Sequence, residues 1–132
     1  MKLYVVTRQD LSPGQQIAQS AHAVAEWCLA VPNEARIWNE QSNTIICLSV
    51  PTEYDLRQSF EYVSGYVRPI LFKEPDFFDE WTAFAVGLSV NSWVLSSFPL
   101  AGKSTGSLLK EAAKREAARN FANNLTTNNI ER

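Results

Sequence analysis

A helix start follows directly on an apolar segment at the beginning of the chain, and this junction constrains the fold most strongly. Residues Lys2–Arg8 are rich in β-branched and aromatic side chains, which predicts a buried strand. The next turn, Asp10–Gln15, places Ser12 at the N-cap, a proline at the first helical position and Gln15 at the capping-box position. We therefore expect a tight turn from the strand into a helix that runs to about Ala30.

The rest of the chain continues to alternate between strand and helix patterns. Further strands are expected at Thr44–Val50, Val67–Phe72 and Thr82–Ser89. Further helices are expected at Asn33–Asn39, Thr52–Gly65 and Thr105–Asn124. This alternation predicts an α/β fold, a single compact domain with a four-stranded, mostly parallel or mixed sheet flanked by helices. A length of 132 residues suits one domain, which we place at residues 1–124, followed by a polar tail at 125–132.

Two of the expected strands carry further information about burial. The segment Thr44–Val50 is apolar throughout, which predicts a strand without a solvated face. Pro69 in the following strand indicates an edge position or a bulge. The two cysteines, Cys28 and Cys47, lie in apolar runs, so we expect both to be buried and unpaired.

The charge distribution limits the kinds of partner that the chain can have. A net charge of −2 argues against a generic nucleic-acid binder, which would be basic overall. Basic residues nevertheless gather near the C-terminus, so any binding of nucleic acid would be weak and salt-sensitive and would use Lys103, Lys110, Lys114, Arg115 and Arg119. The absence of a long apolar run or a signal-peptide pattern predicts a cytoplasmic protein without membrane contact. The sequence leaves monomer and homodimer open.

The first helix carries the one histidine of the chain on a polar stripe. Gln15, Gln19, His22 and Glu26 recur on one side, and the apolar side is expected to face the core through Ile17, Ala21, Val24 and Cys28. A histidine on such a stripe is able to act as a general base or to orient a water molecule. The alternative interpretation is an ordinary solvated helix face.

The segment Glu74–Glu80 is the second candidate for chemistry because it contains four carboxylates. One of them, Asp76, would serve as a general base, or the group would bind a divalent ion. The alternative is a solvated acidic loop. With no Gly-x-Ser-x-Gly motif and a single histidine without paired cysteines, the sequence shows neither a serine nucleophile nor a common zinc site. Hydrolysis would therefore use a positioned water.

The first strand, the turn and the helix together resemble the type-2 (archaeal and eukaryotic) peptidyl-tRNA hydrolases. The Asp-Leu pair at Asp10 and the helix motif Ala-Gln-x-x-His-Ala, here residues 18–23, match that family. The segment Thr82–Gly87 is similar to its late strand. The resemblance implies a compact fold around a four-stranded mixed sheet. It also implies hydrolysis of the ester between a peptide and tRNA, without metal or cofactor.

The resemblance indicates which residues form the site. Its motifs select Asp10, Gln19, His22 and Thr82 as catalytic residues, and Asp76 is added from its position. Substrate-binding residues are expected to be Gln15, Lys103, Lys110, Lys114 and Arg115. The family's lysines are absent from the turn, which is shorter here, and its Asp-Ala-Gly-Arg-Thr segment is missing. Two hypotheses follow: a peptidyl-tRNA hydrolase-like ester hydrolase, or a non-catalytic binding module that kept the fold.

Overall fold

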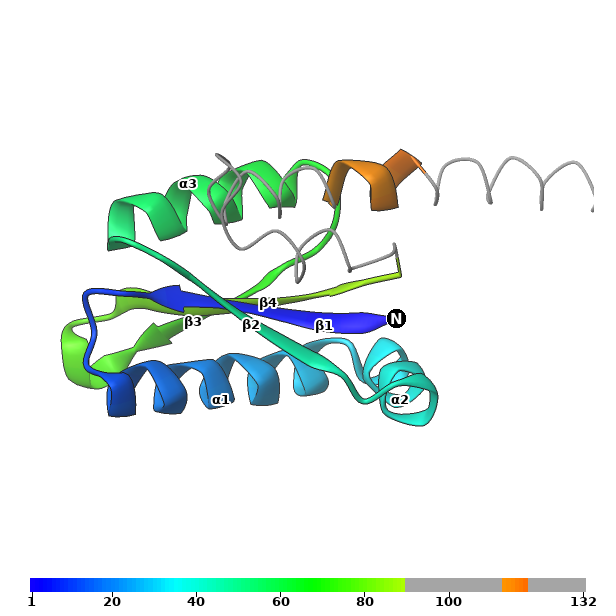
Figure 1. The fold of residues 1–132 in the computed structure, drawn as a ribbon, viewed down its shortest axis with the longest axis horizontal. Helices are drawn as coiled ribbons and strands as arrows, with labels where there is room; N and C mark the ends of the chain where they lie inside the picture. The colour runs from blue at the N-terminus through cyan, green and yellow to red at the C-terminus, as the bar shows by residue number, and fades with distance from the viewer. Residues whose placement is uncertain (90–112, 119–132) are drawn as a thin grey trace, which may run out of the picture.

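A single four-stranded mixed sheet organises the protein (Figure 1). The computed structural model describes residues 1–89 and 113–118. The strand order is β2-β1-β4-β3, in which β1 is parallel to β2 and antiparallel to β4, and β3 is antiparallel to β4. The strands are β1 (Lys2–Arg8), β2 (Ile45–Val50), β3 (Ile70–Glu74) and β4 (Glu80–Leu88). The α/β prediction is confirmed, and the sheet is mixed rather than mostly parallel.

Helices cover both faces of this sheet, as Figure 1 shows. Two helices, α1 (Pro13–Ala30) and α2 (Pro32–Gln41), lie on one face, and α3 (Glu53–Ser64) lies on the other. A short 3-10 helix, η1 (Pro75–Phe77), joins β3 to β4. Residues 113–118 form a helical segment on the α3 side, while the rest of the expected helix 105–124 and the 124/125 domain boundary lie outside the described residues.

The predicted helix starts are present with the expected hydrogen bonds. The backbone N–H of Gln15 donates to the Ser12 hydroxyl at 3.2 Å, and the backbone N–H of Ser12 donates to Gln15 Oε1 at 3.0 Å. This reciprocal capping box satisfies two backbone donors that would otherwise lack partners in the first turn. Thr52 likewise caps α3 by accepting from the backbone N–H of Asp55 at 3.4 Å. The sequence therefore fixes where both long helices begin.

The sheet separates two apolar cores. On the α3 side, Leu56 and Val63 of α3 pack against Phe84 and the even-numbered residues of β1. On the other side, Ala23 and Trp27 of α1 and Trp38 of α2 pack against four strand residues: Leu3 and Val5 of β1 and Ala83 and Ala85 of β4. Burial on both faces provides the main stabilisation of the central strands β1 and β4.

The face that α1 turns toward the sheet differs from the prediction. Gln19, Ala23 and Trp27 are its buried residues, whereas Ile17 is 73% exposed and Val24 is half-buried. The helix has apolar residues on two flanks, and the large indole of Trp27 occupies the core. The predicted polar stripe is therefore split, because Gln19 is buried while the side chains on either side of it along the stripe stay exposed.

The prediction that the second strand lacks a solvated face is wrong. β2 is an edge strand, and α1 lies over β1, β4 and β3 instead of over β2. Ile45 is consequently 44% exposed and Cys47 is also exposed. Cys28 is half-buried, so full burial of the two cysteines is not observed, although both are free thiols as predicted. An apolar strand at a sheet edge has the composition of a buried strand, which explains the error.

Candidate functional site

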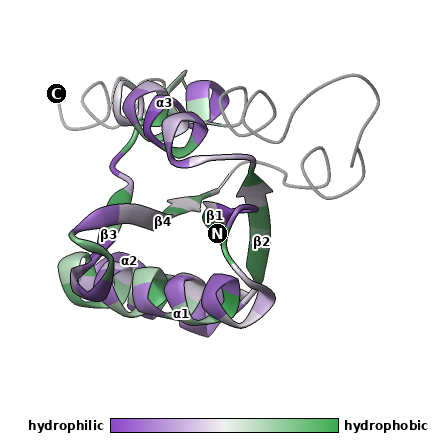
Figure 2. Cartoon of the chain, turned by 90° about the vertical axis from the view of Figure 1, so that its left-hand side faces the viewer, coloured by the Kyte–Doolittle hydropathy of each residue, from purple (hydrophilic) through white to green (hydrophobic). Residues whose placement is uncertain are grey.

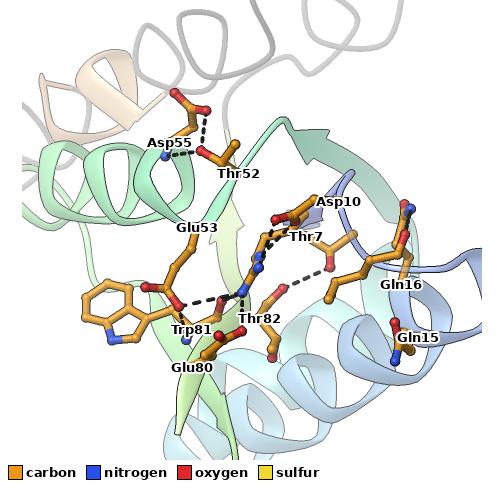
Figure 3. A network of polar contacts seen from close by, with 12 residues as sticks. Thr7, Asp10, Gln15, Gln16, Thr52, Glu53, Asp55, Glu80, Trp81 and Thr82 are labelled. Atoms are coloured by element: carbon orange, nitrogen blue, oxygen red, sulfur yellow. Dashed lines mark hydrogen bonds and ion pairs between the residues drawn. The ribbon is translucent and has the colours of Figure 1, made fainter. Parts of the chain in front are cut away.

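The candidate site lies at the end of the sheet where β1 finishes and β4 begins. The turn after β1, the first turns of α1 and the start of α3 surround this end (Figure 3). Three residues selected by the sequence, Asp10, Gln19 and Thr82, are located here. They belong to two hydrogen-bond networks, one buried beneath α1 and one centred on Arg8.

The first network is a buried chain of three side chains from three elements. Thr82 Oγ1 donates to Gln19 Oε1 at 2.7 Å, and Gln19 Nε2 donates to Glu74 Oε2 at 2.7 Å. Thr82 is 0%, Gln19 is 4% and Glu74 is 8% exposed. The Gln19 amide and the backbone N–H of Asp76 hold the pKa of Glu74 below its ordinary value, because both hydrogen bonds favour the carboxylate. The chain thus ends on a buried, ionised carboxylate.

A β-bulge brings Thr82 into this chain. In the β3–β4 ladder, Phe72 pairs with Ala83 and Lys73 pairs with Trp81, so Thr82 is an extra residue opposite that step. Trp81 contacts α3 through Phe60, while Thr82 and Ala83 both turn toward α1. Regular alternation along the strand would have placed Thr82 on the α3 face. Bulges of this kind re-aim side chains near functional sites.

The second network surrounds the Arg8 guanidinium, which is buried at the end of β1. Asp10 accepts from Nε and Nη2 at 2.9 Å each, and Glu80 accepts from Nη1 at 3.0 Å. A carboxylate oxygen of Glu53 lies 3.6 Å from Nη1. Figure 3 shows these carboxylates converging from the turn, from β4 and from α3. The Arg8 charge is therefore compensated within the protein.

This ion cluster sets the ionisation of its members. The bidentate contact with Arg8 holds the pKa of Asp10 below its ordinary value, and the hydrogen bonds to Asp10 and Glu80 raise the pKa of Arg8 further above an already high one. Arg8 was not selected from the sequence. Its position as the last residue of the first strand, two residues before Asp10, was the available signal.

Consecutive residues of β1 join the two networks to β4. The Thr7 hydroxyl donates to the Thr82 carbonyl at 2.9 Å, and Arg8 Nη1 donates to the Trp81 carbonyl at 3.1 Å (Figure 3). Because neighbouring strand residues point to opposite faces, one contact forms on each side of the sheet. The start of β4 is therefore held from both faces, which fixes the bulge at Thr82.

The remaining predicted site residues lie around these networks. His22 is exposed one turn after Gln19, and its ring stacks on Phe72 with centroids 4.7 Å apart and an interplanar angle of 19°. Asp76 is exposed on η1, and its backbone N–H donates to Glu74 at 3.2 Å. Gln15 is used by the capping box described above. Of the residues selected from the sequence, His22 and Asp76 are therefore the titratable side chains that face solvent beside the buried chain.

Two residues of the predicted basic surface, Lys114 and Arg115, are described, and they lie away from this end of the sheet. Lys114 and Arg115 are exposed on the helical segment 113–118, in which Glu116 accepts a hydrogen bond from the Ser89 N–H at 2.9 Å. Ser89 follows the far end of β4, roughly 23 Å from Thr82 at the rise of an extended strand. Lys103, Lys110 and Arg119 lie outside the described residues.

Comparison with protein-family models and with curated proteins finds no match for this sequence. Within residues 1–89 and 113–118, no three His, Cys, Asp or Glu side chains are grouped as metal ligands. None of the helices in these ranges is long and apolar enough to cross a lipid bilayer. The described part of the site therefore contains a buried hydroxyl, amide and carboxylate that are fixed by hydrogen bonds, and an exposed imidazole beside them. These groups belong to Thr82, Gln19, Glu74 and His22.

Proposed function

We propose that this protein is an ester hydrolase of the type-2 peptidyl-tRNA hydrolase kind, acting on the ester between a peptide and tRNA. One observation carries the proposal: Gln19 of the helix motif and Thr82 of the late strand meet in a single buried hydrogen-bond chain. These residues are 63 positions apart in the sequence, and a bulge is needed to bring them together. The exposed His22 of the same motif lies one turn away.

In this proposal His22 performs the proton transfer. Its exposed imidazole takes a proton from a water molecule as that water attacks the ester carbonyl, and later returns a proton to the leaving ribose oxygen. Stacking on Phe72 fixes the ring plane. Asp76, exposed on η1, is the second solvent-facing group and orients the water or the substrate.

The buried residues are positioning residues in this scheme. Thr82 and Gln19 are too deeply buried to touch a substrate, so they fix the packing of α1 against β3 and thereby the place of His22. Asp10 and Arg8 hold the turn that leads into α1. No metal or cofactor is required for a water attack assisted by a general base.

The binding-module hypothesis is supported by a different observation. Arg8 is the buried cation of the second network, and Asp10, Glu53 and Glu80 all lie within ion-pair distance of it, while Glu53 is also paired with Arg57 at 2.9 Å. A compensated guanidinium is a poor partner for a phosphate group or a developing oxyanion. A fold that keeps the site architecture but lacks such a partner would bind without hydrolysing.

Hydrolysis of an N-acetylated aminoacyl-tRNA by the purified protein separates the two hypotheses. We expect release of the acetylated amino acid, and His22→Ala should reduce the rate about 10²-fold or more with little change in Tm. The matched control is Glu26→Gln, an exposed position one turn further along α1, which should leave the rate unchanged. A stable His22→Ala protein with near-normal turnover would remove His22 from the mechanism.

The rival hypothesis predicts a different pair of results. Binding of the same tRNA, followed by filter retention, without release of the acetylated amino acid at high protein concentration would exclude hydrolysis and support a binding module. If the protein neither binds this tRNA nor releases the acetylated amino acid, both assignments to tRNA are refuted.

A further inference from the structure

An open apolar groove runs between α1 and the edge strand β2. It has a volume of about 550 Å3, and its lining contains no Asp, Glu, Lys or Arg side chain. Ile17, Ala21 and Val24 of α1 form one wall, and Ile45 and Cys47 of β2 form part of the other. The α1 residues are members of the stripe expected from the sequence to face the core. The groove lies on the opposite flank of α1 from His22, and the inference below does not rest on the proposed function.

The groove exists because α1 is displaced toward β4 and β3. The α1-facing side of β2 is left uncovered, as the exposure of Ile45 and Cys47 shows. Figure 2 shows β2 at the outer edge of the sheet, coloured hydrophobic along much of its length. An apolar surface of this kind at a sheet edge is typical of an interaction site.

The two edges of the sheet differ in how they are protected. β3 is preceded by Pro69, carries Lys73 and Glu74 and contains the bulge step, all of which discourage pairing with another strand. β2 has a regular register with β1, and the whole stretch 41–52 contains no charged residue. No described strand pairs with its outer edge. β2 therefore has the features of an edge that accepts a further strand.

We propose that the occupant is β2 of a second copy, paired antiparallel across a two-fold axis near Cys47. The absence of charge favours this partner, because a groove without charged side chains has no group that would bind nucleic acid or a charged peptide. The β2 edge is itself uncharged and apolar, so two copies meet without opposed like charges. A two-fold axis perpendicular to the sheet makes the contact self-complementary.

The geometry of such a pair joins the two grooves. An axis perpendicular to the sheet keeps both α1 helices on the same face of one continuous sheet. In a register centred on Cys47, Ile45 faces Ser49 of the partner subunit, and the two Cys47 side chains face each other. The exposed walls at Ile17 then flank the new central strands from both sides.

Sedimentation equilibrium of the full chain over a range of concentrations tests the proposal. We expect a monomer–dimer equilibrium, and Cys47→Arg should raise the dimer Kd about tenfold or more because it sets two cations opposite each other. Cys47→Ser should preserve the dimer. Leu29→Lys, an apolar-to-lysine change at an exposed position of α1 outside the groove, is the matched control and should also preserve it.

A thiol cross-link locates the interface independently. In a Cys28→Ser background, a short bis-maleimide should link two copies through Cys47, the one remaining cysteine. If Cys47→Arg fails to fold, as judged by its circular dichroism, Ile45→Lys takes its place. A monomer at every concentration would overturn the proposal, as would a dimer that neither cross-links through Cys47 nor weakens with Cys47→Arg. A monomer whose Cys47 reacts slowly with thiol reagents would instead indicate a cover supplied by the same chain.

Discussion

Replacing Thr82 with valine removes one oxygen from the buried chain while keeping the branched shape of the side chain. Gln19 Oε1 then loses the hydroxyl donor that lies 2.7 Å away, in a site where Gln19 is 4% exposed. Leaving a buried acceptor without its donor costs about 1–3 kcal/mol. For a domain of this size, 1 kcal/mol lowers Tm by about 4 °C, so the expected decrease is roughly 4–12 °C.

The assay is chemical and thermal denaturation of the single variants and of a double variant. Replacing both partners by apolar groups, as in Gln19→Leu with Thr82→Val, should cost less than the sum of the two single changes, with a coupling of about 1–2 kcal/mol. The control Thr44→Val changes a hydroxyl outside the buried networks and should stay within about 0.5 kcal/mol of the parent. Unchanged stability of Thr82→Val, or strict additivity in the double variant, would refute the argument.

Three further changes test other parts of the structure. Arg8 lowers the folded-state pKa of Asp10, so this ion pair contributes fully to the free energy of unfolding above the ordinary aspartate pKa of about 3.9. The contribution is lost as the pH falls through the lower folded-state pKa. In urea titrations over that acidic range, the free energy of unfolding of Arg8→Met should depend less on pH than that of the parent. Gly87→Ala places a Cβ 2.8 Å from Trp27 Cζ2 and should lower the free energy of unfolding by about 1–3 kcal/mol in urea; an unchanged midpoint would contradict this contact. Ser12→Ala removes the α1 cap and should cost about 1 kcal/mol, measured as a lower Tm, and a Tm equal to that of the parent would show that the cap contributes nothing.

The helix starts and the order of elements are predictable because they depend on local chemistry. Ser12 and Thr52 cap their helices through side-chain atoms three residues from the donors, a distance that the sequence displays directly. The rotation of α1 is not local. Its two apolar flanks compete for the core, and the outcome depends on partners such as Glu74, which makes burial of Gln19 acceptable.

The candidate site is predictable only in part for the same reason. The motif residue Thr82 can be selected from the sequence, but the bulge that turns it toward α1 depends on its pairing with β3. The sequence indicates only that Arg8 ends an apolar strand. Its role at the centre of the ion cluster depends on Glu53 and Glu80, which are distant in sequence and lie beside it in the fold. Edge and centre positions in a sheet are likewise set by strand order, which explains the error at β2.

The strand order has a consequence for how the chain folds while it is being synthesised. β1 pairs with β4 through residues roughly 80 positions apart, and β4 is also the only one of the described strands that pairs with β3. At a synthesis rate of about 5–20 residues per second, several seconds pass between the synthesis of β1 and that of β4, which pairs with the second edge of β1. β1 exposes unpaired backbone groups throughout that interval, and β3 does so from its own synthesis until β4 follows it. Insertion of β4 between them closes both ladders in one step, so we expect this step, rather than formation of the early β1–α1 unit, to limit productive folding on the ribosome.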